Sequence, residues 1–251
     1  MTLCPEYNPF IDIRLESTRS TSLYLRELAD KEEVKEFTLI RAEYQTAGRG
    51  QRGNSWEAAE GKNLLFSFLV RPSFLLARNQ FLLSQITSLA IKEELDNYAE
   101  GFSIKWPNDI YWKDKKICGM LIENDLSGMY ITQSIAGIGI NINQEQFTSP
   151  APNPISLKQI TGNEYDKEEI LGNILNRYYS YYADLQNGNT GHIIEKYGNA
   201  LFRKKEIHPY MDANGKFQAE IIGVEPDGQL ILKDEDGKER KFMFKEVQYI
   251  I

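Results

Sequence analysis

The residues best suited to chemistry lie in two short stretches of the chain. Residues 47–56 read Ala-Gly-Arg-Gly-Gln-Arg-Gly-Asn-Ser-Trp, with no acidic residue among them. Glycines let backbone amides approach an anion closely, and Arg49 and Arg52 add charge-assisted hydrogen bonds to phosphate or carboxylate. Trp56 offers a flat apolar face for a purine. A surface loop with solvated arginines accounts for the same residues equally well, so this stretch alone does not decide between the two.

The second stretch, residues 105–109, reads Lys-Trp-Pro-Asn-Asp. A lysine that neutralises phosphate oxygens, next to a carboxylate that holds Mg²⁺, suits a magnesium–nucleotide site. A rigid β-turn with a side-chain bond to the backbone is the simpler interpretation of these five residues by themselves.

Two further segments indicate a binding site less strongly. Lys116 lies at the start of an apolar strand that contains Gly119. The Lys116 side chain either reaches a substrate carboxylate or protects a sheet edge, and the second interpretation is the simpler one. Residues 137–143 read Gly-Ile-Gly-Ile-Asn-Ile-Asn. Alternate glycines leave one strand face bare, which makes room either for a flat ligand or for close helix packing.

Composition excludes several classes of function. The formal net charge of −7 over 251 residues argues against a bulk nucleic-acid binder. Cys4 and Cys118 suggest neither a disulfide framework nor a metal site, so a reduced, cytoplasmic setting is expected. The N-terminus lacks the apolar segment of a signal peptide, and no apolar run reaches membrane-spanning length. The two histidines, His192 and His208, lie outside all four segments.

Hydrophobic periodicity predicts the elements that position these residues. Strands are expected over residues 10–15, 38–44, 63–70, 102–105, 109–112, 117–123 and 130–142, and helices over 74–98, 167–186 and 190–201. A further helix is expected to begin at Ser20 or Thr21. The proline-rich residues 147–163 are expected to form a loop. From residue 206 onward, strands at 217–224, 229–233 and 239–244 indicate a small β-barrel or sandwich. Two domains are therefore predicted, residues 1–204 and 205–251.

Taken together and in order, the four segments resemble the biotin protein ligase family. Its loop reads approximately GRGRxGRxW, where this sequence has GRGQRGNSW, and its KWPND motif is matched without change at residues 105–109. Lys116–Glu123 matches the family's K-(L/I)-x-G-(I/M)-L-(V/I)-E, and Gly137–Asn141 matches its G-x-G-I-N. The resemblance covers at least residues 20–142.

The resemblance implies an α+β fold. A mixed β-sheet with flanking helices, like that of class II aminoacyl-tRNA synthetases and biotin synthetases, is expected to precede a small C-terminal SH3-like β-barrel. The monofunctional type is expected, because the motifs begin by residue 20 and leave no room for an N-terminal DNA-binding helix-turn-helix of ~60 residues.

The resemblance also implies the reaction. Biotin and ATP, with Mg²⁺, would give biotinyl-5′-AMP, and the biotinyl group would then pass to a lysine of a biotin carboxyl carrier protein. Neither DNA nor a membrane is an expected partner. Dimers are common in the family, and no motif here decides between a monomer and a homodimer. A lipoate ligase-like adenylating enzyme and a non-catalytic nucleotide-binding protein on the same scaffold are the alternatives.

Site residues follow from the matched motifs. Catalytic roles are implied for Arg49, Lys105 and Lys116, and an Mg²⁺-binding role for Asp109. Biotin-binding roles are implied for Ser20, Thr21, Ser22, Gln45, Gly48, Arg49, Gly50, Gln51, Lys116, Gly119, Gly137 and Gly139. Roles in binding ATP or the adenylate are implied for Asn54, Trp56, Lys105, Asn108 and Asn141. Three of these positions depart from the family pattern: Ser22 stands where Asn is usual, and Gln51 and Asn54 replace arginines.

Overall fold

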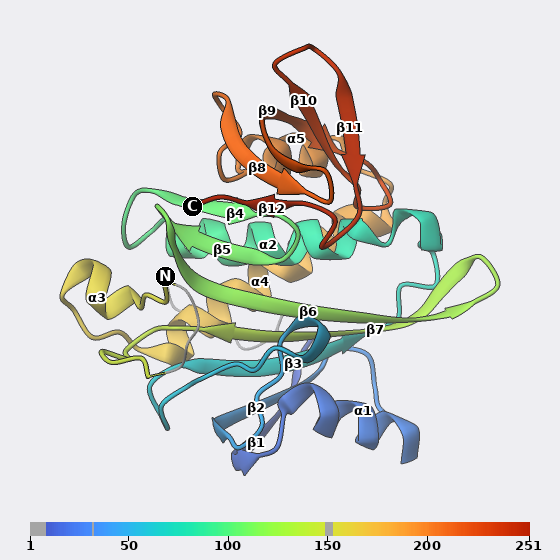
Figure 1. Cartoon of the computed structure of the whole chain (residues 1–251). Coiled ribbons are helices and arrows are strands. Elements are labelled where there is room, and N and C mark those ends of the chain that lie inside the picture. The colour runs from blue at the N-terminus through green and yellow to red at the C-terminus, as the bar shows by residue number, and fades with distance from the viewer. Residues whose placement is uncertain (1–8, 32, 149–152) are drawn as a thin grey trace.

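Seven strands form a mixed central sheet in the spatial order β1-β2-β3-β7-β6-β5-β4 (Figure 1). The computed structural model describes residues 9–31, 33–148 and 153–251. The strands are β1 (Ile11–Thr18), β2 (Thr38–Gln45), β3 (Leu64–Val70), β4 (Phe102–Lys105), β5 (Asp109–Trp112), β6 (Lys115–Ser127) and β7 (Tyr130–Ile140). Only the β1–β2 pair is parallel; the other neighbouring pairs of this sheet are antiparallel. The predicted α+β class with a mixed sheet is confirmed.

Helices cover both faces of this sheet. They are α1 (Thr21–Lys31), α2 (Phe81–Leu95), α3 (Leu157–Thr161), α4 (Lys167–Gln186) and α5 (Gly191–Asn199), with short 3₁₀ turns η2 (Gln51–Gly53) and η3 (Ala77–Asn79). All seven residues of β3 are buried, because its two faces pack against different helices. Leu69 joins Leu25 of α1 in a small hydrophobic cluster, whereas Phe68 contacts the Tyr178 ring of α4 at 4.5 Å between centroids.

A second sheet forms the C-terminal module, which we define as residues 205–251. Its strands are β8 (His208–Asp212), β9 (Gly215–Val224), β10 (Leu230–Asp234), β11 (Glu239–Phe242) and β12 (Gln248–Tyr249), in the order β11-β10-β9-β8-β12. Trp106, in the turn after β4, donates a hydrogen bond of 2.8 Å from Nε1 to the carbonyl of Gly228 and so ties the module to the central sheet. Closure of these strands into a barrel, and the boundary between residues 204 and 205, stay predictions.

Two predicted elements differ from the structure. The helix expected over 74–98 is shorter, because Leu76 pairs with Tyr130 and the amide of Ala77 donates to the carbonyl of Met129. That pairing keeps the start of the segment extended, and α2 begins only at Phe81. Helix α3 lies inside the expected loop over 147–163. It begins with a capping box in which Ser156 and Gln159 satisfy each other's backbone amides.

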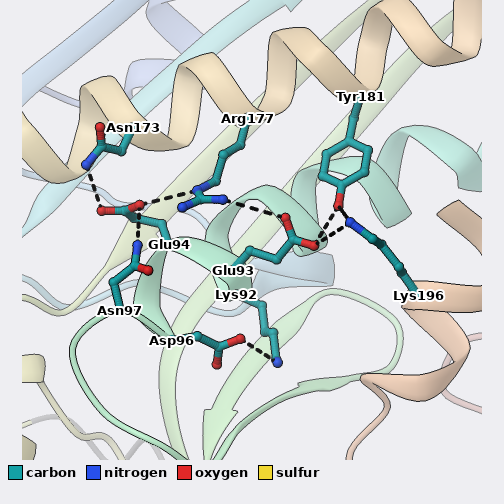
Figure 2. Close-up of polar contacts among 9 residues, drawn as sticks. All are labelled: Lys92, Glu93, Glu94, Asp96, Asn97, Asn173, Arg177, Tyr181 and Lys196. Carbon is teal, nitrogen blue, oxygen red and sulfur yellow. Dashed lines mark hydrogen bonds and ion pairs between the residues drawn. The ribbon is translucent and has the colours of Figure 1, made fainter. Parts of the chain in front are cut away.

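A polar cluster joins α2, α4 and α5 on the side of the sheet opposite α1 (Figure 2). Glu94 is only 1% exposed. Its carboxylate accepts hydrogen bonds from Asn97 and Asn173, both at 3.0 Å, and from Nε of Arg177 at 3.3 Å. A buried carboxylate is tolerated only when donors replace the water it has lost, so this cluster fixes how α4 lies on α2.

Among the described residues, none of the helices combines the length and the apolar character that a membrane span requires.

The cluster predicts a difference between two cations that Figure 2 draws. Replacing Arg177 with glutamine should lower the free energy of unfolding by about 2 kcal/mol, because the buried Glu94 loses its charged donor. The matched change of Lys92 to glutamine should cost less than about 0.5 kcal/mol, since its ion pair with Asp96 lies at the helix surface. Urea unfolding of both variants tests this. Equal losses would contradict the role assigned to Arg177.

Candidate functional site

The register of the central sheet brings the predicted residues into one row. Lys105 on β4 pairs with Asp109 on β5, Asp109 pairs with Gly119 on β6, and Gly119 pairs with Gly139 on β7. Residues paired directly across strands project from the same face of a sheet. The lysine, the carboxylate and the two bare glycine positions therefore share one surface, although they come from three separate sequence motifs.

The flat group that covers these glycines is the indole of Trp56. A Cβ atom added to Gly139 would lie 2.5 Å from Trp56 Nε1, and one added to Gly119 would lie 2.9 Å from Trp56 Cζ3. Within the described residues, Trp56 Nε1 is buried without a hydrogen-bond partner. Gly137 serves a different purpose, because a Cβ there would come within 3.2 Å of the Ser22 side chain at the start of α1. Close packing against the start of α1 therefore explains Gly137, whereas room for a flat ligand at Gly119 and Gly139 stays a prediction.

A close ion pair lies beside the indole. Lys116 Nζ is 2.7 Å from Asp109 Oδ1 and 5.7 Å from the centre of the Trp56 ring. A carboxylate and an ammonium at this distance can exchange partners when an anion arrives, because the ammonium retains further donors. The pair therefore holds a cation at the centre of the row.

The Lys105 ammonium packs against two aromatic rings. Its ammonium lies 5.0 Å from the ring centre of Tyr111 and 4.8 Å from that of Tyr249, a residue of the C-terminal module. Burial lowers the pKa of the Lys105 ammonium, and the charges of Lys116 and Arg203 act in the same direction, whereas Asp109 opposes them. An ammonium held by aromatic faces remains free to bind an anion.

Neutral hydrogen-bonding groups gather at the other end of the row. The amide of Thr21 donates to Gln45 Oε1 at 2.7 Å, and the Thr21 hydroxyl lies 2.7 Å from that of Ser67 on β3. The hydroxyls of Ser20 and Ser22 are 3.1 Å apart. All of these side chains are uncharged, so this end suits a neutral polar ligand group with both donors and acceptors.

The loop that follows β2 closes over the row. It folds back on itself, since the amide of Gly50 donates to the Asn54 carbonyl at 2.7 Å and the amide of Trp56 donates to the Gly48 carbonyl at 2.9 Å. Arg49 Nη2 lies 3.5 Å from Glu123 Oε1 on β6. The loop thus presents its arginine at the edge of the sheet surface and its tryptophan on that surface.

These groups enclose a cavity of about 630 Å³. Sixteen of the predicted site residues line it: Ser20, Thr21, Ser22, Gln45, Arg49, Gly50, Gln51, Asn54, Trp56, Lys105, Asn108, Asp109, Lys116, Gly119, Gly137 and Gly139. The Asn108 side chain is also held by the Met120 carbonyl. The sequence motifs therefore converge on one site.

Two predicted residues do not line the cavity. Asn141 is buried, and its Nδ2 donates to the Ile155 carbonyl at 3.1 Å, so its side chain supports the segment before α3. Gly48 lies behind the loop, where a Cβ would come within 2.6 Å of the Trp56 carbonyl oxygen. A contact of Asn141 with a nucleotide and of Gly48 with biotin stay predictions.

The sequence did not indicate the contribution of the C-terminal module. Residues Phe244, Lys245, Val247, Gln248 and Tyr249 line the cavity next to Lys105. Their sequence carries no ligand-binding pattern, and only the docking of the second sheet brings them to the site. The one signal available was Lys245 itself, a cation directly after the last expected strand.

Cys118, the cysteine that the structure describes, does not line the cavity. Cys118 lies on β6 and is buried, and burial raises the pKa of its thiol, which keeps it protonated. Cys4 lies outside the described residues. His192 is 3.2 Å from Asp184 at the end of α4, in another part of the molecule.

Comparison with known proteins places the chain in a family. Residues 14–141 match the sequence profile of the Biotin/lipoate A/B protein ligase family. The bifunctional ligase/repressor BirA of Bacillus subtilis is 30% identical over 233 residues, which cover 89% of this chain and 68% of that protein. The chain belongs to the biotin/lipoate A/B protein ligase family.

Two further relatives narrow the comparison within the biotin/lipoate ligase family. The biotin–[acetyl-CoA-carboxylase] ligase of Paracoccus denitrificans is 29% identical over 210 residues, covering 80% of this chain and 85% of that protein. The structure of the Aquifex aeolicus biotin protein ligase in complex with biotin and ATP superimposes with a TM-score of 0.79 at 28% identity, covering 95% of this chain and 99% of that one. The names of both relatives specify biotin rather than lipoate.

Proposed function

We propose that this member of the family is a biotin protein ligase. It joins biotin to ATP to give biotinyl-5′-AMP and pyrophosphate, and it then transfers the biotinyl group to a lysine of a biotin carboxyl carrier protein. One observation carries the proposal: the cavity is ordered across the sheet. Neutral donors and acceptors lie at the start of α1, the end of β2 and on β3. The indole covers β7 and β6, and cations follow at β6 and β4.

That order matches the two substrates. The ureido ring of biotin is neutral and both donates and accepts hydrogen bonds, so it fits the end formed by Thr21, Gln45 and the neighbouring serines. The valeryl chain then runs along the sheet beside Trp56, and its carboxylate reaches Lys116. The nucleotide takes the remaining space, with its phosphates toward Lys105 and its base toward Trp56 and Asn54.

The first chemical step needs two anions to meet. A carboxylate oxygen of biotin attacks the α-phosphorus of ATP, and pyrophosphate leaves. Lys116 stabilises the approaching carboxylate and Lys105 the phosphate oxygens, while Arg49 adds charge from the loop. Because these cations are fixed before the substrates arrive, they offset the repulsion without reorganising at the moment of reaction.

Magnesium is the expected metal. Among the described residues, no three His, Cys, Asp or Glu side chains lie close enough together to hold a metal ion. Mg²⁺ in nucleotide sites is usually held by only one or two carboxylates, with substrate phosphates and water completing its shell. Asp109 in the cavity wall would supply that carboxylate, and the bound ion would further neutralise phosphate charge.

The loop serves the second step. The mixed anhydride is labile in water, so the segment from Gly48 to Trp56 should stay closed over it until the acceptor arrives. The amine of the acceptor lysine attacks the acyl carbon of the anhydride, and AMP leaves with the bonding electron pair. The proton lost by the amine passes to solvent or to the departing phosphate.

A binding and transfer experiment tests the function. Isothermal titration should show biotin binding with much higher affinity than lipoate, and incubation with biotin, MgATP and a biotin carboxyl carrier domain should biotinylate that domain on one lysine. Preference for lipoate would favour the lipoate ligase alternative. Binding of ATP without transfer of either vitamin would favour the non-catalytic alternative.

A further inference from the structure

We infer that Lys245 of the C-terminal module binds the β- and γ-phosphates of ATP and the pyrophosphate that they become. The inference rests on the proposed function and extends it to a residue outside all four sequence motifs. It assigns part of the nucleotide site to the second sheet.

The charges that line the cavity point to an anion at this position. Of the described lining residues, five are charged: Arg49, Lys105, Asp109, Lys116 and Lys245. Arg49 is paired with Glu123, and Lys116 with Asp109. Neither Lys105 nor Lys245 forms an ion pair with any carboxylate in the described part of the chain. Two cations in one cavity wall, neither of them in an ion pair with a described carboxylate, form a site for a multiply charged anion.

Both unpaired cations lie at the same end of the cavity. Lys105 is on β4, the edge strand farthest from the neutral end at Thr21. Its ammonium lies over the ring of Tyr249 in β12, and Lys245 precedes Tyr249 by four residues, in the segment between β11 and β12. This end lies beyond Lys116 when the sheet is followed from β7 to β4. A polyphosphate that extends from an α-phosphate at Lys116 therefore reaches Lys105 and Lys245.

The backbone at Lys245 is unfavourable for a lysine. Its φ is 73°, in the left-handed region where a side chain costs roughly 1–2 kcal/mol and glycine costs little. The turn is fixed by its neighbours, since the amide of Met243 donates to the Glu246 carboxylate at 2.6 Å and the amide of Glu246 donates to the Met243 carbonyl at 3.1 Å. Strain of this kind is common where a side chain is needed for binding.

The strain makes a decisive variant available. Replacing Lys245 with glycine removes the cation and relieves the backbone, so it should preserve or raise the free energy of unfolding. At the same time the KM for ATP and the inhibition constant of inorganic pyrophosphate should each rise about tenfold, the loss expected for one charge-assisted contact. The affinity for biotin should not change. Replacing Lys245 with arginine should restore most of the ATP affinity.

Lys113 provides a matched control. It is also an exposed lysine in the left-handed region, with φ of 51°, but it lies in the β5–β6 turn and does not line the cavity. Replacing Lys113 with glycine changes the net charge and the backbone in the same way, and should leave both ATP constants at the wild-type value.

The outcomes separate this inference from the proposed function. If the wild-type protein turns over and the Lys245→Gly variant keeps the wild-type constants for ATP and pyrophosphate, the inference is wrong and the ligase function stands. If the wild-type protein shows no biotin-dependent turnover, the ligase function fails. In that case, titration of the protein with inorganic pyrophosphate tests the role of Lys245 independently of the ligase function. Weaker binding by Lys245→Gly than by Lys113→Gly supports that role, and equal binding overturns it.

Discussion

Replacing Lys116 with alanine is expected to reduce biotin-dependent adenylate formation by about 100- to 1,000-fold, the usual cost of removing one preorganised charge at a developing anion. In the structure, Lys116 holds its ammonium 2.7 Å from Asp109 at the centre of the cavity. In the absence of the Lys116 ammonium, one cation fewer offsets the repulsion between the triphosphate and the carboxylates of Asp109 and biotin. The loss should appear mainly in kcat.

The fold should survive this substitution. Lys116 connects to its neighbours through its backbone, whose amide donates to Asn153 at 2.8 Å and whose carbonyl accepts from Ile155 at 2.9 Å. Lys115, the preceding residue, is exposed and does not line the cavity, so Lys115→Ala is the matched control. Pyrophosphate release should fall only in the Lys116 variant. Near-wild-type release by Lys116→Ala, with an unchanged unfolding midpoint, would remove Lys116 from the mechanism.

Gly139→Ala is expected to weaken the binding of both biotin and ATP and to lower kcat/KM by about 100-fold. The added methyl group cannot coexist with Trp56, whose indole Cε2 would lie 2.4 Å from it. The indole must therefore leave the sheet and take the end of the loop with it. Because the loop carries Arg49, one methyl group displaces both the aromatic surface and a cation.

Gly223→Ala is the control for this change. Gly223 is also a strand glycine, on β9, and a Cβ there meets no atom within 4 Å. Intrinsic tryptophan fluorescence should shift in Gly139→Ala, as the half-buried Trp56 leaves the sheet surface, and should not shift in Gly223→Ala. If Gly139→Ala binds biotin as tightly as the wild-type protein, the indole does not depend on the bare strand for its position.

Local sequence signals predicted most of the fold. The alternation and burial pattern of residues 63–70 indicated a buried strand, and helix α4 occupies the predicted residues 167–186. Prediction failed where a tertiary contact overrode the local pattern. The helix expected from residue 74 rested on the apolar pattern from Phe81 onward, and before it Leu76 pairs with Tyr130 of the β6–β7 hairpin instead.

The site was predictable to the extent that motifs carry it. Lys105, Asp109, Gly119 and Gly139 were each proposed from local sequence, but their alignment in one row depends on strand register, which no single motif contains. The C-terminal residues at the cavity could not be predicted, since their role arises from the docking of two sheets. Likewise, the sequence showed that the glycine face was bare, but not that Trp56 would cover it.

Biotin-dependent exchange of labelled pyrophosphate into ATP tests the central claim most directly, because it requires a carboxylate and a triphosphate to react in this one cavity. Rapid exchange is expected when biotin and Mg²⁺ are present, and none when biotin is omitted or replaced by a biotin analogue without a carboxylate. With Lys116→Ala, exchange should be about 100- to 1,000-fold slower. Exchange that proceeds equally well without biotin, or no exchange at saturating biotin and MgATP, would contradict it.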